Sequence, residues 1–250
     1  MRRSIFIVIA VFVFLIVSNV CNATGKNAMF YQAGDFYKQG KYKEAAETYE
    51  SIVKDGFVSG PLYYNLANSY FKDGKVGIAI LNYRRAERLM PRDSDLDSNC
   101  KYVNSFVKNN ANVLPRNLFL KILDRYKDNL SLDEISKLLL FFYILSGLIV
   151  FLGMYLHLNK RKITTITLIL AIIFVFNVAI LISKSTSERN KAIVVSDLEA
   201  KFEPLDSATT HFSLSEGVEV FILKDEGFWF KIKRADGKMG WAAKNSIKKI

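Results

Sequence analysis

The side chains that could carry covalent or metal chemistry are sparse in this chain of 250 residues. It holds two histidines, His157 and His211, and two cysteines, Cys21 and Cys100. A nucleophilic thiol needs a base beside it, and a zinc site needs closely spaced Cys and His ligands; this spacing favours neither. We therefore interpret Cys100 as a small packing residue of a helix.

Three alternating aspartates are the nearest approach to a metal motif. Asp93, Asp95 and Asp97 follow Pro91 with a spacing that resembles the start of a calcium loop. The glycine and the distal glutamate of such a loop are missing, so capping of a helix start is the better interpretation. Hydrolase, metalloprotease, P-loop and dinucleotide-binding fingerprints are absent from the sequence as well. The sequence predicts a protein that is not an enzyme and that uses no cofactor or metal.

A pattern of small and aromatic residues occurs twice near the N-terminus, at an offset of 34 residues. The offset pairs Ala33 with Ala67, Phe36 with Tyr70, Gly40 with Gly74, Ala45 with Ala79 and Tyr49 with Tyr83. A 34-residue period is typical of the tetratricopeptide (TPR) helix–turn–helix unit. We expect the alanines where two helices cross and the glycines where the first helix of each unit ends.

The repeats predict an α-helical TPR array over residues 26–110, with units at about 26–59 and 60–93 and a capping helix. An amphipathic connector over residues 111–137 follows it. Arrays of so few units bury little surface. We therefore expect residues 115–137, or a partner, to complete the core of the array.

The concave face of such an array is its predicted protein-binding surface. Helical spacing puts these residues of interest on that face: Tyr37, Lys38, Tyr64, Asn68, Phe71, Lys72 and Tyr102, with Phe30, Gly34, Ser105 and Phe106 beside them. Aromatic rings combined with lysines suit an extended or helical protein segment. TPR domains that clamp a C-terminal carboxylate carry lysine and asparagine where Phe30 and Gly34 stand, which argues against an acidic C-terminal peptide. The alternative is that some of these aromatics belong to the core.

Two uncharged runs predict a transmembrane α-hairpin. Residues 138–158 and 163–183 each hold 21 residues, which is about 31 Å of helix and enough to cross a bilayer core. The loop 159–162 between them reads NKRK, and the positive-inside rule puts it in the cytoplasm. Asn177 is the notable polar residue of the runs. It could bond to a partner protein's helix, to the neighbouring span or to its own backbone.

Residues 1–23 predict a signal peptide. Arg2 and Arg3 precede an apolar run, and CNA offers small residues for cleavage after Ala23. An uncleaved anchor and a lipid-modified Cys21 are the alternatives. A signal peptide and a cytoplasmic loop together predict a two-span protein of the inner (cytoplasmic) membrane, with its N- and C-terminal domains on the periplasmic, extracytoplasmic side.

The net charge of +11 is shared between the predicted domains and the segments outside them. Nearly half of it comes from Arg2, Arg3 and the basic residues 160–162. The remaining parts are only mildly basic, so the sequence does not predict a nucleic-acid partner.

Residues 188–250 change to short β-rich runs separated by KDEG and ADGK, which predict hairpins and a small all-β barrel. The region resembles bacterial SH3-like domains at Glu216, Gly217, Trp229, Gly237, Gly240 and Trp241. Members of that group often bind cell-wall peptide or protein, so the resemblance implies Trp229 and Trp241 as ligand contacts. The alternative is that both tryptophans form the barrel core. The aromatic motif of proline-binding SH3 domains is missing at AIVVSD.

The complete order of signal peptide, short array, two-span hairpin and SH3-like domain resembles the Bat E-type proteins of aerotolerance operons. The resemblance also rests on YNLANSYFKDGKVGIAILNYRRAERLMPRDSDLDSN. It implies a membrane-anchored protein–protein interaction scaffold of the cell envelope, in a stress or aerotolerance complex with von Willebrand A-type domain proteins. The alternative is a receptor or sensor that binds peptidoglycan through the SH3-like domain.

The predicted topology can be tested with a reporter that is active only outside the cytoplasm. Fused after Asn110 or after Ile250, the reporter should be active, and fused after Arg161 it should be silent, because the basic loop stays inside. Activity at Arg161 together with silence at the other two sites would contradict the orientation.

Overall fold

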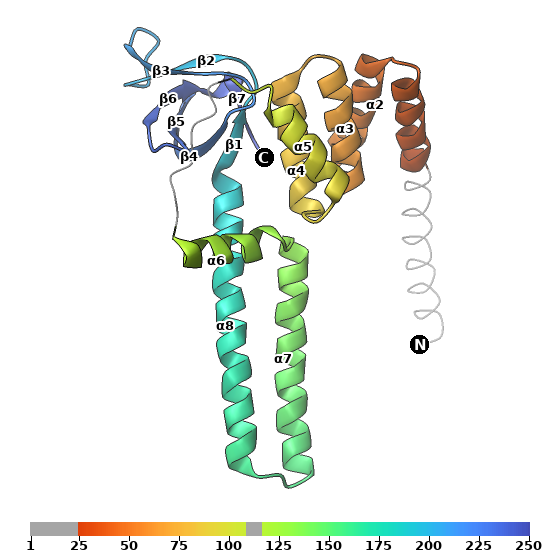
Figure 1. Ribbon diagram of the computed structural model, residues 1–250, viewed down its shortest axis with the longest axis vertical. Coiled ribbons are helices and arrows are strands. Elements are labelled where there is room, and N and C mark those ends of the chain that lie inside the picture. Colours follow the sequence, from red (N-terminus) through yellow and green to blue (C-terminus); the bar gives the residue numbers. More distant parts are fainter. Residues whose placement is uncertain (1–24, 109–116) are drawn as a thin grey trace, which may run out of the picture.

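The computed structural model describes residues 25–108 and 117–250 (Figure 1). In this part of the chain, helices combine with an antiparallel seven-stranded sheet, so the fold is a mixed one. The signal peptide predicted over residues 1–23, its cleavage after Ala23 and the alternatives at Cys21 lie outside the described residues.

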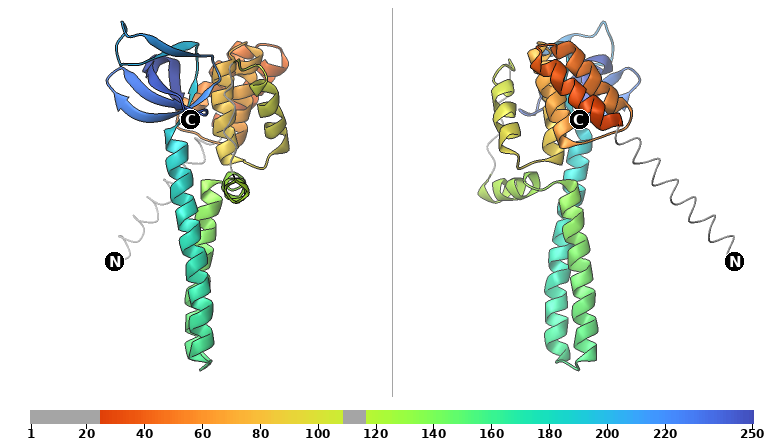
Figure 2. Two further views of the ribbon diagram at one scale, coloured as in Figure 1. Left: turned by 60° about the vertical axis from the view of Figure 1, so that its left-hand side comes forward. Right: turned by 90° about the vertical axis from the view of Figure 1, so that its right-hand side faces the viewer.

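The N-terminal part is a row of antiparallel helices (Figures 1 and 2). It comprises a helix over residues 25–38, α2 (Tyr42–Lys54), α3 (Gly60–Lys72), α4 (Val76–Leu89) and α5 (Ser94–Asn104). Gly40 and Gly74 follow the first helix of each pair with positive φ of 76° and 81°, a conformation that costs glycine little. The predicted turn positions of both glycines are confirmed.

The core of this helical array lies at the predicted crossings. Ala33, Ala45, Ala67 and Ala79 are all completely buried, and Tyr49, Tyr70 and Tyr83 are buried beside them. Small residues allow the helix axes to approach, while the rings fill the space next to the crossing. The expectation for the alanines is therefore confirmed.

Helix α5 confirms the predicted roles of Asp93 and Cys100, but it is shorter than the sequence predicts. The Asp93 side chain accepts a hydrogen bond from the Leu96 N–H and caps the helix start. Cys100 packs in the core of the array, and burial, followed by the nearby Glu87, raises the pKa of its thiol to about 12. The helix ends at Asn104, short of the predicted Asn110.

Two long antiparallel helices follow a short one. Helix α6 (Leu118–Asp128) precedes α7 (Leu132–Tyr155) and α8 (Lys160–Asn190). Both α7 and α8 are long and apolar enough to cross a membrane. Helix α7 starts before the predicted run 138–158, at a capping box of Ser131 and Glu134, and ends at Tyr155, before that run does. Helix α8 extends beyond the run 163–183 at both ends, so the predicted loop 159–162 lies mostly in its first turn. The last turns of α8 are polar and lead directly into the first strand.

The C-terminal part is an antiparallel sheet that curls around its buried face (Figure 2). Its strands are β1 (Lys191–Val194), β2 (Leu198–Lys201), β3 (Thr210–Leu214), β4 (Glu219–Glu226), β5 (Trp229–Arg234), β6 (Met239–Ala243) and β7 (Ile247–Lys249). They are ordered β3-β2-β6-β5-β4-β1-β7. Gly227 and Gly237 have positive φ in the turns after β4 and β5, so the two predicted hairpins are confirmed.

The sheet packs directly against α4 of the array. The Gly77 N–H, in the first turn of α4, donates to the Glu216 carboxylate at 3.2 Å. Lys75, the N-cap residue of α4, forms no side-chain cap, so Glu216 supplies an acceptor and a negative charge from another part of the chain. A Cβ at Gly77 would lie 2.9 Å from the Val194 carbonyl oxygen, which shows how closely the two backbones approach.

The contact with the sheet completes the core of the helical array. Ile193 of β1 is completely buried within the array's hydrophobic cluster, with Val195 and Ile250 packed against it. The expectation that residues 115–137 complete this core is wrong for the described part of that segment, since α6 crosses α8 (Figure 1) and none of its residues belongs to the cluster. The helical array also contacts the long helices, since Arg92 forms an ion pair with Glu134 at the start of α7.

Two identical substitutions distinguish this interface from ordinary helix surface. Gly77→Ala should destabilise the full chain by about 1–3 kcal/mol, since its Cβ would overlap the Val194 carbonyl. Gly34→Ala is the matched control: its Cβ would meet only the Tyr49 hydroxyl at an ordinary 3.4 Å. This change should stabilise by up to about 1 kcal/mol through helix propensity. Chemical unfolding in detergent micelles measures both, and stabilisation by Gly77→Ala would contradict the close packing.

Candidate functional site

An exposed aromatic cluster lies where α3 meets the end of α5. The rings of Phe71, Tyr102 and Phe106 contact one another edge to face, with centroids 5.2–5.8 Å apart. Tyr102 and Phe106 are exposed, and Phe71 is half-buried. Edge-to-face contacts hold the three rings in a defined arrangement. This set, the Phe71 cluster, brings together three residues that were predicted on the concave face.

Hydroxyl and amide groups form a second set within the array. The Asn99 amide donates to the Tyr64 hydroxyl, and the Tyr83 hydroxyl donates to the Asn68 side-chain oxygen. The predicted groove residues Tyr64 and Asn68 are thus both bonded within the array. Their remaining lone pairs and protons could still meet a polar backbone.

Tyr83 of this set, and Tyr37 near it, have raised pKa values and stay protonated. Burial raises the pKa of Tyr83, as does the proximity of Tyr64. Burial also raises the pKa of Tyr37, followed by the effects of Tyr42 and Tyr64. Neutral hydroxyls can both donate and accept, which suits the N–H and C=O groups of a peptide.

The other predicted groove residues lie toward the first helix or are solvated. The Tyr37 ring contacts the Tyr42 ring at a centroid distance of 5.2 Å. Lys38 is exposed and pairs with Asp35 at 3.4 Å, and Lys72 is exposed on α3. The residues predicted to line the groove therefore form two groups: an apolar one at Phe71 and a polar one at Tyr37 and Tyr64.

Trp229 and Trp241 lie on the outer face of the sheet. Burial alternates along β5 and β6, and the buried positions are those of Phe230, Ile232, Gly240 and Ala242. Both tryptophans are half-buried on the opposite face, so the alternative that they form the barrel core is wrong.

Two lysines accompany these tryptophans. Trp241 is paired across the sheet with both Lys231 and Lys201. The Lys231 ammonium lies 5.9 Å from the Trp241 ring centroid, and the Lys201 ammonium lies 6.0 Å from that of Trp229. These four residues form what we name the Trp/Lys face. Indole rings beside ammonium groups can stack on sugar rings or apolar groups and pair with carboxylates.

A charged junction joins the array, the end of α8 and the sheet. Arg88 of α4 binds Glu188 of α8 at 2.9 Å and also donates to the Ile250 carbonyl. Arg84 pairs with Glu219 of β4 at 3.4 Å. A cavity of about 290 Å³ lies between these groups, and opposite charges around it largely compensate one another.

The sequence offers little signal for this junction. Its residues come from separate segments, and each charge resembles an ordinary solvated one. The exception is the pair Lys184 and Glu188, whose i, i+4 spacing predicts contact on one helix face; they are 3.4 Å apart and nearly buried.

Neither a search for metal-ligand groups nor a comparison with known proteins adds a further candidate site. Within residues 25–108 and 117–250, no group of three or more His, Cys, Asp or Glu side chains is placed to hold a metal ion. No protein-family model and no curated protein matches the chain. The candidate sites therefore rest on their own geometry: the Phe71 cluster with the neighbouring tyrosines, and the Trp/Lys face.

Proposed function

We propose that the chain is a membrane-anchored protein–protein interaction scaffold of the cell envelope. In this proposal a TPR array and a bacterial SH3-like domain stand outside the cytoplasm on a transmembrane hairpin formed by α7 and α8. One observation carries it: the array and the sheet pack on each other at the same end of α7 and α8 (Figure 1). Two packed domains on one support present two binding surfaces in a fixed relation.

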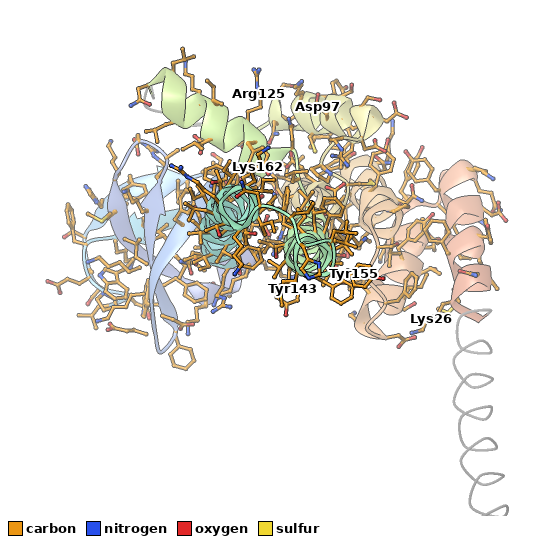
Figure 3. All side chains as sticks on the ribbon, turned by 90° about the horizontal axis from the view of Figure 1, so that it is seen from below. Lys26, Asp97, Arg125, Tyr143, Tyr155 and Lys162 are labelled. Atoms are coloured by element: carbon orange, nitrogen blue, oxygen red, sulfur yellow. The ribbon has the colours of Figure 1, made fainter. Side chains whose placement is uncertain are left out.

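The orientation rests on the opposite end of the hairpin. Figure 3, seen from below, shows Tyr155 and Lys162 near the turn between the two long helices. Lys160, Arg161 and Lys162 open α8 there. Basic residues of this kind favour the cytoplasmic side, which would leave both domains in the periplasm.

The domain identities are proposed from sequence and geometry together. Four completely buried alanines at the 34-residue offset support TPR units. The sheet's short antiparallel strands, with Gly217 and Gly237 at positive φ, support an SH3-like domain. With the domain order, these features support membership of the Bat E-type proteins, and so a von Willebrand A-type domain protein as partner and a role in stress or aerotolerance.

The binding surface proposed for the partner combines the two parts of the array's groove. The Phe71 cluster offers exposed rings, which are common anchors of interfaces. The hydroxyls of Tyr37 and Tyr64 offer hydrogen bonds on the same array. An extended or helical protein segment with apolar side chains suits this combination.

A second candidate function is favoured by the Trp/Lys face. Its tryptophans are turned outward beside two lysines. Peptidoglycan carries sugar rings that stack on indoles and peptide carboxylates that pair with ammonium groups. The chain could then be a receptor or sensor of the cell wall, with the array passing on the bound state.

The scaffold proposal predicts loss of partner capture when the Phe71 cluster is removed. Phe71→Ala combined with Tyr102→Ala should abolish crosslinking of full-length protein to its membrane partners, because the anchoring rings are gone. Tyr31→Ala is the control, since Tyr31 is 71% exposed and stands outside the cluster. Crosslinking in native membranes with mass spectrometry identifies the partners, and helical melting curves verify folding.

Two outcomes distinguish the scaffold from the receptor, and a third tests whether the Phe71 cluster lies on the surface. Capture that survives the double substitution would contradict the scaffold surface. Sedimentation of full-length protein with peptidoglycan, lost in Trp229→Ala with Trp241→Ala, would support the receptor instead. A double variant at Phe71 and Tyr102 that unfolds would place these rings in the core and remove the groove assignment.

A further inference from the structure

Helix α6 has an apolar face that the helices and the sheet leave uncovered. Leu118, Ile122 and Tyr126 are spaced four residues apart and therefore lie along one face of the helix. Leu118 is 74% exposed and Ile122 is 59% exposed. Exposed aliphatic side chains that share one helix face form a surface on which an apolar partner can pack.

Two hydrogen bonds fix how α6 lies on α8. The Tyr126 hydroxyl donates to the Asn177 side-chain oxygen at 2.8 Å, and the Lys184 ammonium donates to the Lys127 carbonyl at 2.9 Å. Asn177 lies seven residues before Lys184, which is about 10 Å farther along α8 toward the middle of its apolar run. The Tyr126 ring also contacts Phe176. Tyr126 thus points toward the middle of the apolar run.

The direction of Tyr126 sets the direction of the whole apolar face. Around the helix Ile122 is turned about 40° and Leu118 about 80° from Tyr126, so Ile122, and less directly Leu118, lies on the side that faces the apolar part of the hairpin. Figures 1 and 2 show α6 lying crosswise to the long helices, and Figure 1 shows its N-terminal end extending past α8. Helix α6 crosses α8 near Lys184. The uncharged run 163–183 of α8 ends at the same level.

One border of the apolar face of α6 is basic. Lys121 precedes Ile122 and Arg125 precedes Tyr126, which turns each cation about 100° from the apolar residue that follows it, and both lie on the Leu118 side of the face. Figure 3 shows Arg125 pointing outward, away from the two long helices. Cations beside an apolar face are typical of helices at a bilayer surface, where the charges meet lipid phosphates.

We propose that α6 is an interfacial helix, lying in the surface of the lipid bilayer on the side of the array and the sheet. Its apolar face enters the acyl boundary, and the bond of Tyr126 to Asn177 sets its depth. The occupant of the exposed face is lipid. This inference rests on the proposed membrane-spanning role of α7 and α8, because their apolar runs define the level of the bilayer.

The bond to Asn177 also explains a polar side chain within an apolar run. The amide N–H of Asn177 donates to the Ile173 carbonyl of its own helix, and its oxygen accepts from Tyr126. Both polar groups are therefore satisfied, which hydrocarbon surroundings require. Of the bonding partners considered from the sequence, Asn177 uses its own backbone, and a residue of α6 takes the place of a neighbouring span.

Spin labels at single cysteines test the position of α6 in the full chain. Leu118→Cys, Ile122→Cys and the control Lys121→Cys are made with Cys21 and Cys100 replaced by serine. A fourth label at Leu148→Cys, exposed in the middle of α7, reports whether the hairpin spans. The protein is reconstituted in vesicles of phosphatidylethanolamine and phosphatidylglycerol. Power saturation then compares accessibility to oxygen, which enters lipid, with accessibility to a water-soluble nickel complex.

The expected result is a ratio of oxygen to nickel accessibility several-fold higher at 118 and 122 than at 121, together with a high ratio at 148. A high ratio at 148 with low ratios at 118 and 122 would overturn the inference and leave the spanning hairpin intact. A low ratio at 148 would overturn the spanning hairpin itself, and the inference with it. Labels at 118 and 122 closed to both reagents would mean that protein, such as a second copy, covers the face, which also overturns the inference.

Discussion

The close packing of α4 against β1 is the contact on which the rest of the architecture depends. A helical array with so few units leaves apolar surface on its last helices, and strand β1 with Ile193 covers it. The approach requires glycine at Gly77, where a Cβ would meet the Val194 carbonyl, and at Gly217, where it would lie 2.5 Å from Ile80. The array and the sheet therefore complete each other, although the long helices separate them in the sequence.

The charged junction extends this contact to the long helix α8. Helix α8 ends at Asn190 and β1 begins at Lys191, so no linker separates the long helix from the sheet. Arg88 attaches the array to Glu188 in the last turns of the same helix. A partner that moves the array would thus act on α8 as well, and this fixed geometry suits either a scaffold or a receptor.

Sequence reasoning succeeds where the relevant physics is local. The 34-residue offset predicts the buried alanines, Asp93 is the N-cap of α5, and Gly227 and Gly237 lie in the hairpin turns. Each of these depends on helix crossing, capping or turn geometry within a short segment. The apolar runs likewise predict α7 and α8, because a long uncharged stretch is a property of composition.

Contacts between segments that are distant in the chain could not be predicted from the sequence. Glu216 resembles a surface charge in the sequence, and only the fold brings it to the first turn of α4. The outward position of Trp229 and Trp241 depends on strand register, where a shift of one residue exchanges the two faces of the sheet. The predicted groove residues Tyr64 and Asn68 lie on a helix as expected, yet their hydrogen bonds to Asn99 and Tyr83 depend on neighbouring helices.

The most direct test of the central claim is hydrogen exchange at the Gly77 amide, resolved by NMR in the full chain in detergent micelles. An amide in the first turn of a helix has no acceptor within that helix and normally exchanges fast. If the sheet caps α4 through Glu216, Gly77 should be protected as strongly as Leu81 in the interior of α4, because both exchange only when the array and the sheet open together. Fast exchange at Gly77 with strong protection at Leu81 would contradict the account, since it would mean that α4 is folded without the sheet packed against it.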